Sequence, residues 1–255
     1  MSADPINPPL PWLDGDTPFP PVATAWGPDT GAPGLLAAGD DLELERLVGA
    51  YSQGIFPWFS QGQPVLWWSP TPRMVLETAQ FRMHRSLTKT LQRYQLNPSF
   101  LLCFDRAFDQ VIENCASAPR KQQNGTWIVP AMVQAYQRLH RAGYAHSAEV
   151  WLDGQLVAGL YFVCLGKAVF GESMFSRISD GSKMALSALV QVCLRHGIDQ
   201  IDCQQNTPHL ASLGAKEMPR TEFLARMALN QREMSPCWSA QCIGGFSGAR
   251  LANNA

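Results

Sequence analysis

The sequence has no excess of one charge, no long apolar run and no signal segment. Its 20 basic and 21 acidic residues give a formal net charge of −1, so the chain as a whole does not attract polyanions. No stretch has the apolar length that a membrane span requires. Residues 1–21 are rich in proline and aspartate and lack the basic start and apolar centre of a signal peptide. With 255 residues, 46% of them hydrophobic, the chain is expected to form one large or two modest globular domains.

Metal-binding and nucleophilic motifs are also missing. The seven cysteines include no C-x-x-C pair, which argues against a structural zinc site and favours reduced thiols. There is no G-x-S-x-G nucleophile elbow and no glycine-rich phosphate loop. Only one histidine, His209, follows an acidic strand residue closely, so no catalytic triad is expected.

An aromatic segment is the most distinctive feature that is present. Residues 54–59 read GIFPWF and residues 67–70 read WWSP. Pro57 ends any preceding helix and Pro70 holds the chain extended, so a rigid, irregular loop is expected. Its aromatic wall has two interpretations: a surface on which a flat group such as a nucleobase stacks, or a small core that fills the seam between two domains.

The pattern along the chain predicts an α+β fold in two parts. Residues 1–34 are expected to form an irregular proline-rich arm and residues 35–72 a small N-terminal domain that contains the aromatic segment. Residues 73–234 are expected to form the larger domain, followed by a tail at 235–255. The tail and the arm have no predicted role.

Apolar spacing predicts the elements of these parts. Helices are expected after Asp40 and Asp41, at about 81–94, from Pro130 to Gly143, between about 180 and Gly197, and from about 221. Strands are expected at 73–76, 148–152, 155–164, 168–175 and 198–203, with Asp153-Gly154 as a hairpin turn. An antiparallel meander surrounded by helices, with one more strand after a core helix, indicates the α+β class.

Positive charge is concentrated in one predicted helix. Between Arg73 and Phe104 the only acid is Glu77. Side chains at spacings of three and four share a helix face, and this spacing relates Arg82, Arg85, Lys89 and Arg93. A solvated helix face is one interpretation, but such faces usually mix signs. An unbalanced basic face on a neutral protein favours contact with a phosphate backbone.

Three polar residues lie in predicted strands. Glu172 is an acid among apolar strand residues, which requires a partner and is compatible with a structural ion pair or a functional role. Asp202 and Gln204 lie at the end of another strand, where alternation places them on one side. They are able either to orient and deprotonate an amine or merely to terminate the strand.

Several segments together resemble the leucyl/phenylalanyl-tRNA–protein transferases. The matching segments follow the family's order and extend over about residues 34–232: 54–59, 66–70, 72–73, 125–128, 146, 149–151, 171–177, 201–204 and 211–215. Thr71 departs from the pattern, because many members have an acid there, and the arm and the tail after Met234 lie outside the resemblance. Each segment alone is weak, but their shared order is highly specific.

The resemblance implies a fold and a reaction. The larger domain would be GNAT-like, and the enzyme would move leucine or phenylalanine, with methionine as a further donor, from tRNA to the α-amine of an N-terminal arginine or lysine. That transfer would mark the acceptor for degradation by the N-degron (N-end rule) pathway in the cytoplasm. The ester is already activated, so no cofactor or metal is implied. A monomer without membrane contact is expected.

The resemblance also implies site residues. Trp58 and Trp127 would flank the terminal adenosine of the tRNA. Glu172, Asp202 and Gln204 would hold the acceptor, with Asp202 as the base or the group that orients the amine. The apolar pocket for the donor side chain would be lined by Leu160, Met174, Leu186, Leu189 and Cys193, the last three of which core packing would explain equally well.

Two alternative functions are set against this one. An N-acyltransferase that uses acyl-CoA would share the fold, but residues 176–181 (SRISDG) offer one glycine and an acid where a pyrophosphate loop is needed. A non-catalytic RNA-binding module would explain the aromatic and basic residues, but it leaves Glu172 and Asp202 without a role.

Overall fold

The computed structural model describes residues 7–118, 128–238 and 242–243. The N-terminal part is a small sheet in the order β1-β2-β4-β3, covered by helix α1 (Leu44–Tyr51). Its strands are β1 (Trp12–Leu13), β2 (Leu35–Gly39), β3 (Phe56–Pro57) and β4 (Val65–Trp68). Strand β1 pairs with β2 in parallel, so the sequence expected to be an irregular arm supplies a strand, and also a short 3-10 helix, η1 (Val22–Thr24).

The larger part is an eight-stranded sheet in the order β11-β5-β10-β9-β8-β7-β6-β12. Within it only β9 and β10 pair in parallel, and the other neighbours are antiparallel. The strands are β5 (Arg73–Glu77), β6 (Leu101–Phe104), β7 (Ala145–Leu152), β8 (Gln155–Leu165), β9 (Ala168–Ser176), β10 (Gln200–Gln204), β11 (Lys216–Met218) and β12 (Cys242–Ile243). Strand β12 joins residues of the expected C-terminal tail to this sheet.

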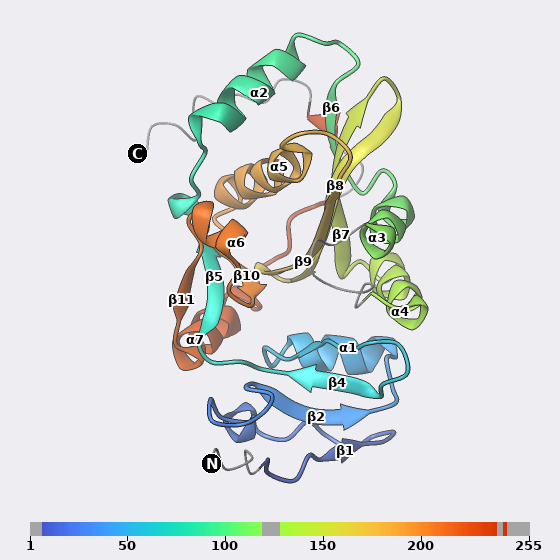
Figure 1. Cartoon of the computed structure of the whole chain (residues 1–255), viewed down its shortest axis with the longest axis vertical. Coiled ribbons are helices and arrows are strands. Elements are labelled where there is room, and N and C mark those ends of the chain that lie inside the picture. Colours follow the sequence, from blue (N-terminus) through green and yellow to red (C-terminus); the bar gives the residue numbers. More distant parts are fainter. Residues whose placement is uncertain (1–6, 119–127, 239–241, 244–255) are drawn as a thin grey trace, which may run out of the picture.

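Helices cover both faces of the large sheet (Figure 1). Helices α2 (Arg85–Gln95) and α5 (Gly181–Arg195) lie on one side, and α3 (Phe108–Ser117) and α4 (Pro130–Arg141) on the other. The 3-10 helix η2 (Thr78–Gln80), α6 (Pro208–Ser212) and α7 (Arg220–Asn230) complete the part next to β5 and β10. The mixed α/β architecture, with a small N-terminal part followed by a larger one, agrees with the sequence prediction.

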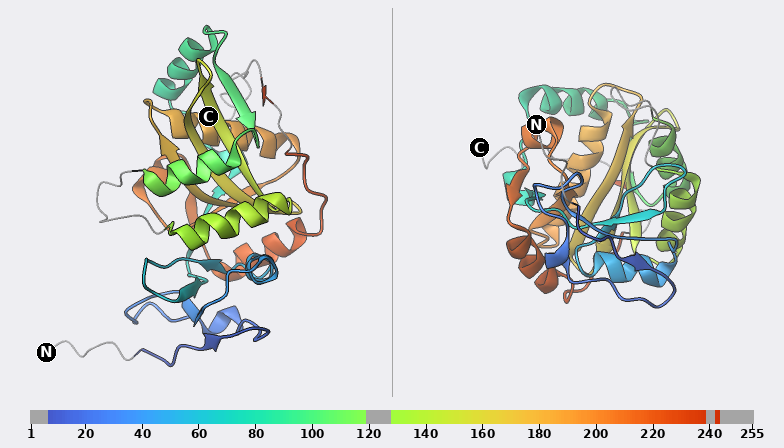
Figure 2. Two further views of the ribbon diagram at one scale, coloured as in Figure 1. Left: turned by 90° about the vertical axis from the view of Figure 1, so that its right-hand side faces the viewer. Right: turned by 60° about the horizontal axis from the view of Figure 1, so that its bottom comes forward.

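The apolar core forms two clusters, one for each face of the large sheet. The cluster on the side of α2 and α5 lies within the larger part. The other continues from the α3 and α4 side into the N-terminal part, and it includes Tyr51, Phe56, Tyr136, Phe170 and Phe223. The two parts therefore share one buried core, and Figure 2 shows them packed directly together.

Local signals in the sequence placed several elements correctly. Asp153 and Gly154 have φ values of 51° and 75° and join β7 to β8 with Leu152 opposite Gln155, as expected for a two-residue hairpin. Pro130 is the first residue of α4, where its missing N–H costs nothing. Strand β10 follows α5, as predicted.

Three expectations were wrong in detail. Helix α2 begins at Arg85 and not near Phe81, because the chain there is tied down: Arg82 N donates to Leu213 O and Phe81 is buried. Helix α1 begins after Glu43, and Asp41 accepts a hydrogen bond from the Glu43 N–H at 2.6 Å without capping the helix itself. Cys103 is disulfide-bonded, which corrects the expectation that all thiols are reduced.

Candidate active site

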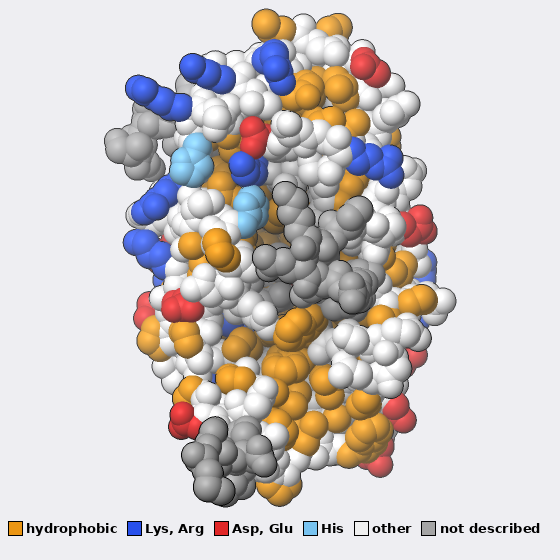
Figure 3. Space-filling model, in the orientation of Figure 1, with side chains coloured by type: hydrophobic (Ala, Val, Ile, Leu, Met, Phe, Trp, Pro, Cys, Tyr) orange, Lys and Arg blue, Asp and Glu red, His pale blue; other side chains and the backbone are white. Residues whose placement is uncertain are grey.

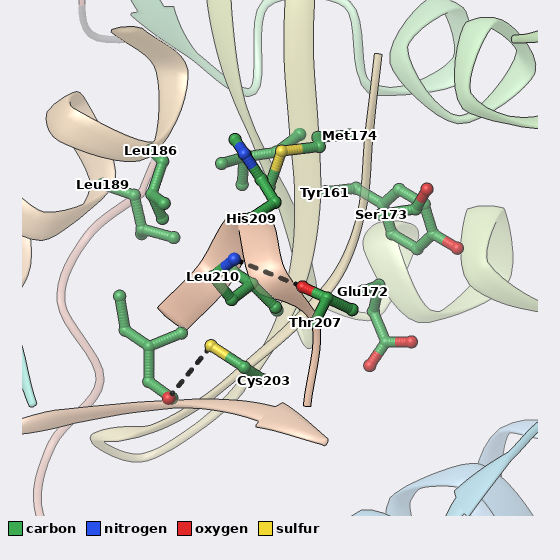
Figure 4. A pocket seen from close by; sticks show the side chains of 13 residues that line it. Tyr161, Glu172, Ser173, Met174, Leu186, Leu189, Cys203, Thr207, His209 and Leu210 are labelled. Carbon is green, nitrogen blue, oxygen red and sulfur yellow. Dashed lines mark hydrogen bonds between the residues drawn. The ribbon is translucent and has the colours of Figure 1, made fainter. Parts of the chain in front are cut away.

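A cavity of about 240 Å³ opens between α5, α6 and the strands β8, β9 and β10. Figure 4 shows Leu186 and Leu189 on one side of it and Glu172 on the opposite side, with Met174 between them. Most of the lining is apolar. Glu172 is the only carboxylate among the lining residues, so the cavity combines an apolar wall with one acidic group.

The Glu172 carboxylate is held by hydrogen bonds from three elements. Tyr51 in α1 donates to Oε1 at 2.7 Å, and Gln204 Nε2 in β10 donates to the same oxygen at 3.0 Å. Tyr136 in α4 donates to Oε2 at 3.1 Å. The two tyrosine hydroxyls are also within hydrogen-bond distance of each other, but each has one proton, so only two of these three hydroxyl contacts are hydrogen bonds at once when Glu172 is ionised. These donors are neutral, so the structural ion pair considered for Glu172 is absent from the described part of the chain.

The surroundings of Glu172 disfavour its charged form. Burial raises the pKa of the Glu172 carboxyl to about 7, although hydrogen bonds from Tyr51, Tyr136 and Gln204 act in the opposite direction. Burial and the neighbouring Glu172 charge raise the pKa of both tyrosines well above the usual value. The tyrosines therefore stay neutral donors at any pH at which the protein is expected to work, while Glu172 titrates near neutrality.

Asp202 has a different environment. It is 1% exposed and accepts two parallel hydrogen bonds from Arg73, from Nε at 2.8 Å and from Nη2 at 2.6 Å. The Arg73 guanidinium lies 4.8 Å from the ring centroids of both Phe56 and Phe223. Asp202 is thus half of a buried ion pair and does not line the cavity, which argues against its expected role as the base.

The expectation that strand alternation places Asp202 and Gln204 together was wrong. The pairing of β10 with β5 shifts between these residues, so that Asp202 lies opposite Val75 and Gln204 opposite Met74. Gln204 has a φ of 62°, and its backbone N–H donates to Asp202 Oδ1 at 2.8 Å. This bulge breaks the alternation and lets the Gln204 side chain reach Glu172.

Four of the five residues expected around the donor side chain line the cavity: Leu160, Met174, Leu186 and Leu189. Cys193 does not; it is fully buried one helical turn beyond Leu189 and belongs to the core. Burial raises the pKa of its thiol. The apolar stripe of α5 therefore divides between the cavity and the core, a distinction that periodicity cannot make. His209 also lines the cavity, and burial, followed by the charge of Lys183, lowers its pKa.

The expected adenosine contacts are only partly described. Trp58 is partly exposed, packs edge-on against Trp68 with ring centroids 5.4 Å apart, and accepts a bond at its carbonyl from Trp68 Nε1 at 2.7 Å. The aromatic segment is thus both a core element and a partly open surface. Trp127 lies outside the described residues.

Three of the four basic residues that were expected to share a helix face lie on α2. Arg85, Lys89 and Arg93 are exposed on α2 at intervals of four residues, whereas Arg82 precedes the helix. Figure 3 shows lysine and arginine side chains gathered at the upper left of one face, over the region of α2. Within the described ranges none of these three residues forms an ion pair with an acidic side chain, so the positive charge is not neutralised locally.

One group of potential metal ligands lies away from the cavity: Asp105, His140 and His146. Hydrogen bonds account for its arrangement. Asp105 accepts from the Ser147 N–H at 2.8 Å and lies 2.7 Å from His146 Nδ1, while His140 Nδ1 lies 2.8 Å from the Ala145 carbonyl. The group therefore serves as a link between α4, β6 and β7.

Sequence reasoning missed Tyr51, Tyr136 and the role of Arg73. Both tyrosines lie in helices that apolar spacing predicts, and both are fully buried. A buried tyrosine hydroxyl needs a hydrogen-bond partner, which was the only available signal. Nothing in the local sequence points from these tyrosines to Glu172.

No helix in the described part of the chain is long and apolar enough to cross a membrane.

Comparison with known proteins agrees with the geometry. The family model for the leucyl/phenylalanyl-tRNA protein transferase matches residues 75–228, and that for its N-terminal domain matches residues 40–71. A leucyl/phenylalanyl-tRNA–protein transferase from Albidiferax ferrireducens is 58% identical over 93% of both chains. One from a Polaromonas species is 59% identical over 92% of both.

Solved structures add little. A GCN5-related N-acetyltransferase-like protein from Streptococcus suis aligns with 69% of this chain and 62% of its own, at 17% identity and a TM-score of 0.31. That score is too low to establish a shared fold. The sequence relatives are stronger evidence than the solved structures, because they are more than half identical to this chain over nearly its whole length. The chain belongs to the leucyl/phenylalanyl-tRNA–protein transferase family.

Proposed function

We propose that this enzyme transfers leucine or phenylalanine, with methionine as a further donor, from tRNA to the α-amine of proteins that begin with arginine or lysine. The observation that carries the proposal is a cavity whose lining combines an apolar wall with Glu172 on the opposite side. An apolar wall suits the side chain of the donor amino acid, and a carboxylate suits the ammonium group of the acceptor. The sequence relatives support the choice of an aminoacyl-tRNA donor.

The donor side chain would lie against Leu160, Met174, Leu186 and Leu189. The terminal adenosine would stack on the aromatic segment at Trp58, with Trp127 as the second expected contact. The tRNA backbone would follow the exposed basic face of α2 at Arg85, Lys89 and Arg93. The reacting ester would then lie between the apolar wall and Glu172.

The chemistry requires positioning more than activation. An aminoacyl ester already carries a good leaving group, so the reaction proposed here needs no cofactor. Holding the amine and the ester carbon together provides much of the rate. We infer a GNAT-like arrangement for the larger part, supported by the antiparallel meander β7–β9 and the parallel pairing of β10 with β9 after α5.

We place the reaction in the cytoplasm, where aminoacyl-tRNA is made, and propose that the product is a degradation signal of the N-degron pathway. A monomer is sufficient for the proposed site, because every group named comes from one chain.

The decisive experiment incubates the protein with radiolabelled leucyl-tRNA and peptides that differ only in their first residue. Label should enter peptides that begin with arginine or lysine, and it should not enter a peptide with an acetylated N-terminus or one that begins with glutamate. Leucyl-CoA in place of leucyl-tRNA serves as the control for a CoA-dependent enzyme. Binding of leucyl-tRNA without transfer to any peptide would contradict the proposal and leave an RNA-binding module.

A further inference from the structure

The acceptor amine must lose a proton before it attacks. An α-amino group has an ordinary pKa of about 7.7–8.0, so most of it is protonated at pH 7. We propose that Glu172, and not Asp202, accepts this proton. The inference rests on the proposed function, since it concerns the acceptor of that reaction.

Asp202 is poorly placed to act as a base because it is buried away from the cavity and paired with a cation. Oδ1 accepts from Arg73 Nε and from the Gln204 backbone N–H, both at 2.8 Å, and Oδ2 accepts from Arg73 Nη2 at 2.6 Å. A guanidinium and a backbone amide only donate. A proton on Asp202 would neutralise the partner of Arg73 and leave the guanidinium charge uncompensated in the core, where Asp202 is 1% exposed.

Glu172 has the opposite properties. Glu172 is partly exposed and lines the cavity, and among the described residues Oε2 accepts one hydrogen bond, from Tyr136 at 3.1 Å. The partners at Oε2 and at one side of Oε1 are hydroxyls, which both donate and accept. The Tyr51 and Tyr136 hydroxyls can therefore rearrange their hydrogen bonds when Glu172 gains a proton, because that proton supplies a third donor for the three contacts among these groups.

The charged and titratable groups around Glu172 agree with this role. Desolvation brings its pKa to about 7, close to the expected working pH, which is the best value for a general base. Asp202 disfavours the charge on Glu172 further. The titratable and charged groups of the described residues that face the cavity or the hydrogen-bond network are Tyr51 of α1, Arg73 of β5, Tyr136 of α4, Tyr161 of β8, Lys183 of α5, Asp202 and Cys203 of β10 and His209 of α6.

The step conserves protons. The acceptor ammonium gives one proton to Glu172, and the neutral nitrogen then attacks the ester carbon. A C–N bond forms, the bond between that carbon and the ribose oxygen breaks, and the second proton lost by the nitrogen goes to the departing oxygen. The products are an amide and tRNA with a free terminal hydroxyl. Glu172 returns its proton to water.

The test is the pH dependence of single-turnover transfer from leucyl-tRNA to an arginine peptide. The wild type should show a rise in rate with pH that levels off above a pKa near 7. Glu172→Gln should lower the rate at pH 7 by about tenfold, because only about a tenth of the free amine is neutral at that pH, and should move the rising limb to the ordinary pKa of the amine, about 7.7–8.0. Asp202→Asn, if folded, should retain the limb.

A second acceptor separates proton transfer from simple binding. In a peptide whose α-amine is replaced by an aminooxy group, the attacking nitrogen is already unprotonated at neutral pH. Glu172→Gln should therefore slow transfer to this peptide far less than transfer to the amine peptide. Equal losses with both acceptors would reduce Glu172 to a binding group and overturn the inference.

If Glu172→Gln does not fold, the variant Tyr136→Phe provides a second test of the proposal. The Tyr136 hydrogen bond lowers the pKa of Glu172, so its removal should move the limb to higher pH. An unmoved limb would overturn the inference while leaving the proposed function intact. Absence of transfer by the wild type at every pH would instead refute the proposed function.

Discussion

At the scale of single residues, the site separates two carboxylates by their partners. Asp202 forms an ion pair with Arg73 and is buried in the core. Glu172 instead accepts hydrogen bonds from neutral groups at the edge of the cavity. A charged partner stabilises a carboxylate, while burial without one destabilises it. Two acids of similar chemistry therefore have different proton affinities, and this difference is the basis of the roles proposed for them.

The first prediction concerns the ion pair. Asp202→Asn should lower the free energy of unfolding by about 3–5 kcal/mol, because Arg73 would remain charged and buried without its partner. Urea denaturation of the variant and the wild type provides the measurement. The double variant Arg73→Met with Asp202→Leu removes both charges and should recover much of the loss. A single variant as stable as the wild type would contradict the importance of the pair.

The second prediction links Glu172 to the pH dependence of stability. Its pKa in the folded protein, about 7, is above the ordinary value of 4.5, so the folded state holds the proton more tightly than the unfolded state. The stabilisation is present below about pH 4.5 and is lost as the pH rises to 7. Between pH 5 and pH 8 the wild type should lose about 2–3 kcal/mol relative to Glu172→Gln, as measured by urea unfolding at both pH values. A difference that does not change with pH would show that Glu172 is not desolvated.

At the scale of elements, α5 presents one apolar stripe to two environments. Leu186 and Leu189 reach the cavity, and Cys193 one turn later packs in the core. The helix is buried on most of its surface, so its sequence carries little contrast between the two sides.

The third prediction uses this division. Leu189→Ala should enlarge the cavity and favour phenylalanine over leucine, while lowering stability by about 2–5 kcal/mol. The measurement is the ratio of transfer from phenylalanyl-tRNA to transfer from leucyl-tRNA. Cys193→Ala is the matched control: it removes core volume on the same helix face and should leave the ratio unchanged. A changed ratio in the control, or an unchanged one in Leu189→Ala, would place the donor pocket elsewhere.

The fourth prediction concerns α2. Arg85→Glu with Lys89→Glu reverses two charges that are exposed and form no ion pair within the described residues, so folding should be little affected. Binding of full leucyl-tRNA should weaken and lose part of its dependence on salt, because fewer phosphates would be neutralised. Binding of leucyl-adenosine, which lacks the backbone, should stay the same. Equal weakening of both ligands would indicate a structural role for the helix.

At the scale of the whole molecule, the small N-terminal part contributes to the proposed active site. Tyr51 from α1 holds Glu172 directly, and Phe56 from β3 packs against the guanidinium that holds Asp202. Both residues belong to the core cluster that continues into the larger part. The site is therefore an interface between the two parts and does not belong to the larger one alone.

The fifth prediction follows from the shared core. The two parts should unfold in one cooperative transition, because exposing the seam would expose the same apolar cluster that stabilises both. Tryptophan fluorescence reports mainly on the N-terminal part, which has five of the eight tryptophans, and far-ultraviolet circular dichroism reports on the whole chain. The two transitions in urea should coincide. Separate midpoints would show that the N-terminal part folds independently.

The sequence by itself determined the elements that depend on neighbouring residues. Asp153-Gly154 specifies its hairpin because both residues tolerate positive φ, and Pro130 marks the start of α4 because a proline is suited to a first helical turn. The charge pattern of α2 and the apolar wall of the cavity were also predicted, and the motifs of residues 54–59, 171–177 and 201–204 led to the correct family.

Only the tertiary structure decided which groups meet. Tyr51 and Glu172 are 121 residues apart, and Arg73 and Asp202 are 129 apart. A periodic pattern says that a side chain is buried, but not what it contacts after the chain has folded. The bulge at Gln204 depends on pairing between β10 and β5, and the separation of Leu189 from Cys193 depends on packing against other elements. These contacts determine the proton affinity of each carboxylate, and hence its role, because that affinity depends on partners supplied by distant parts of the chain.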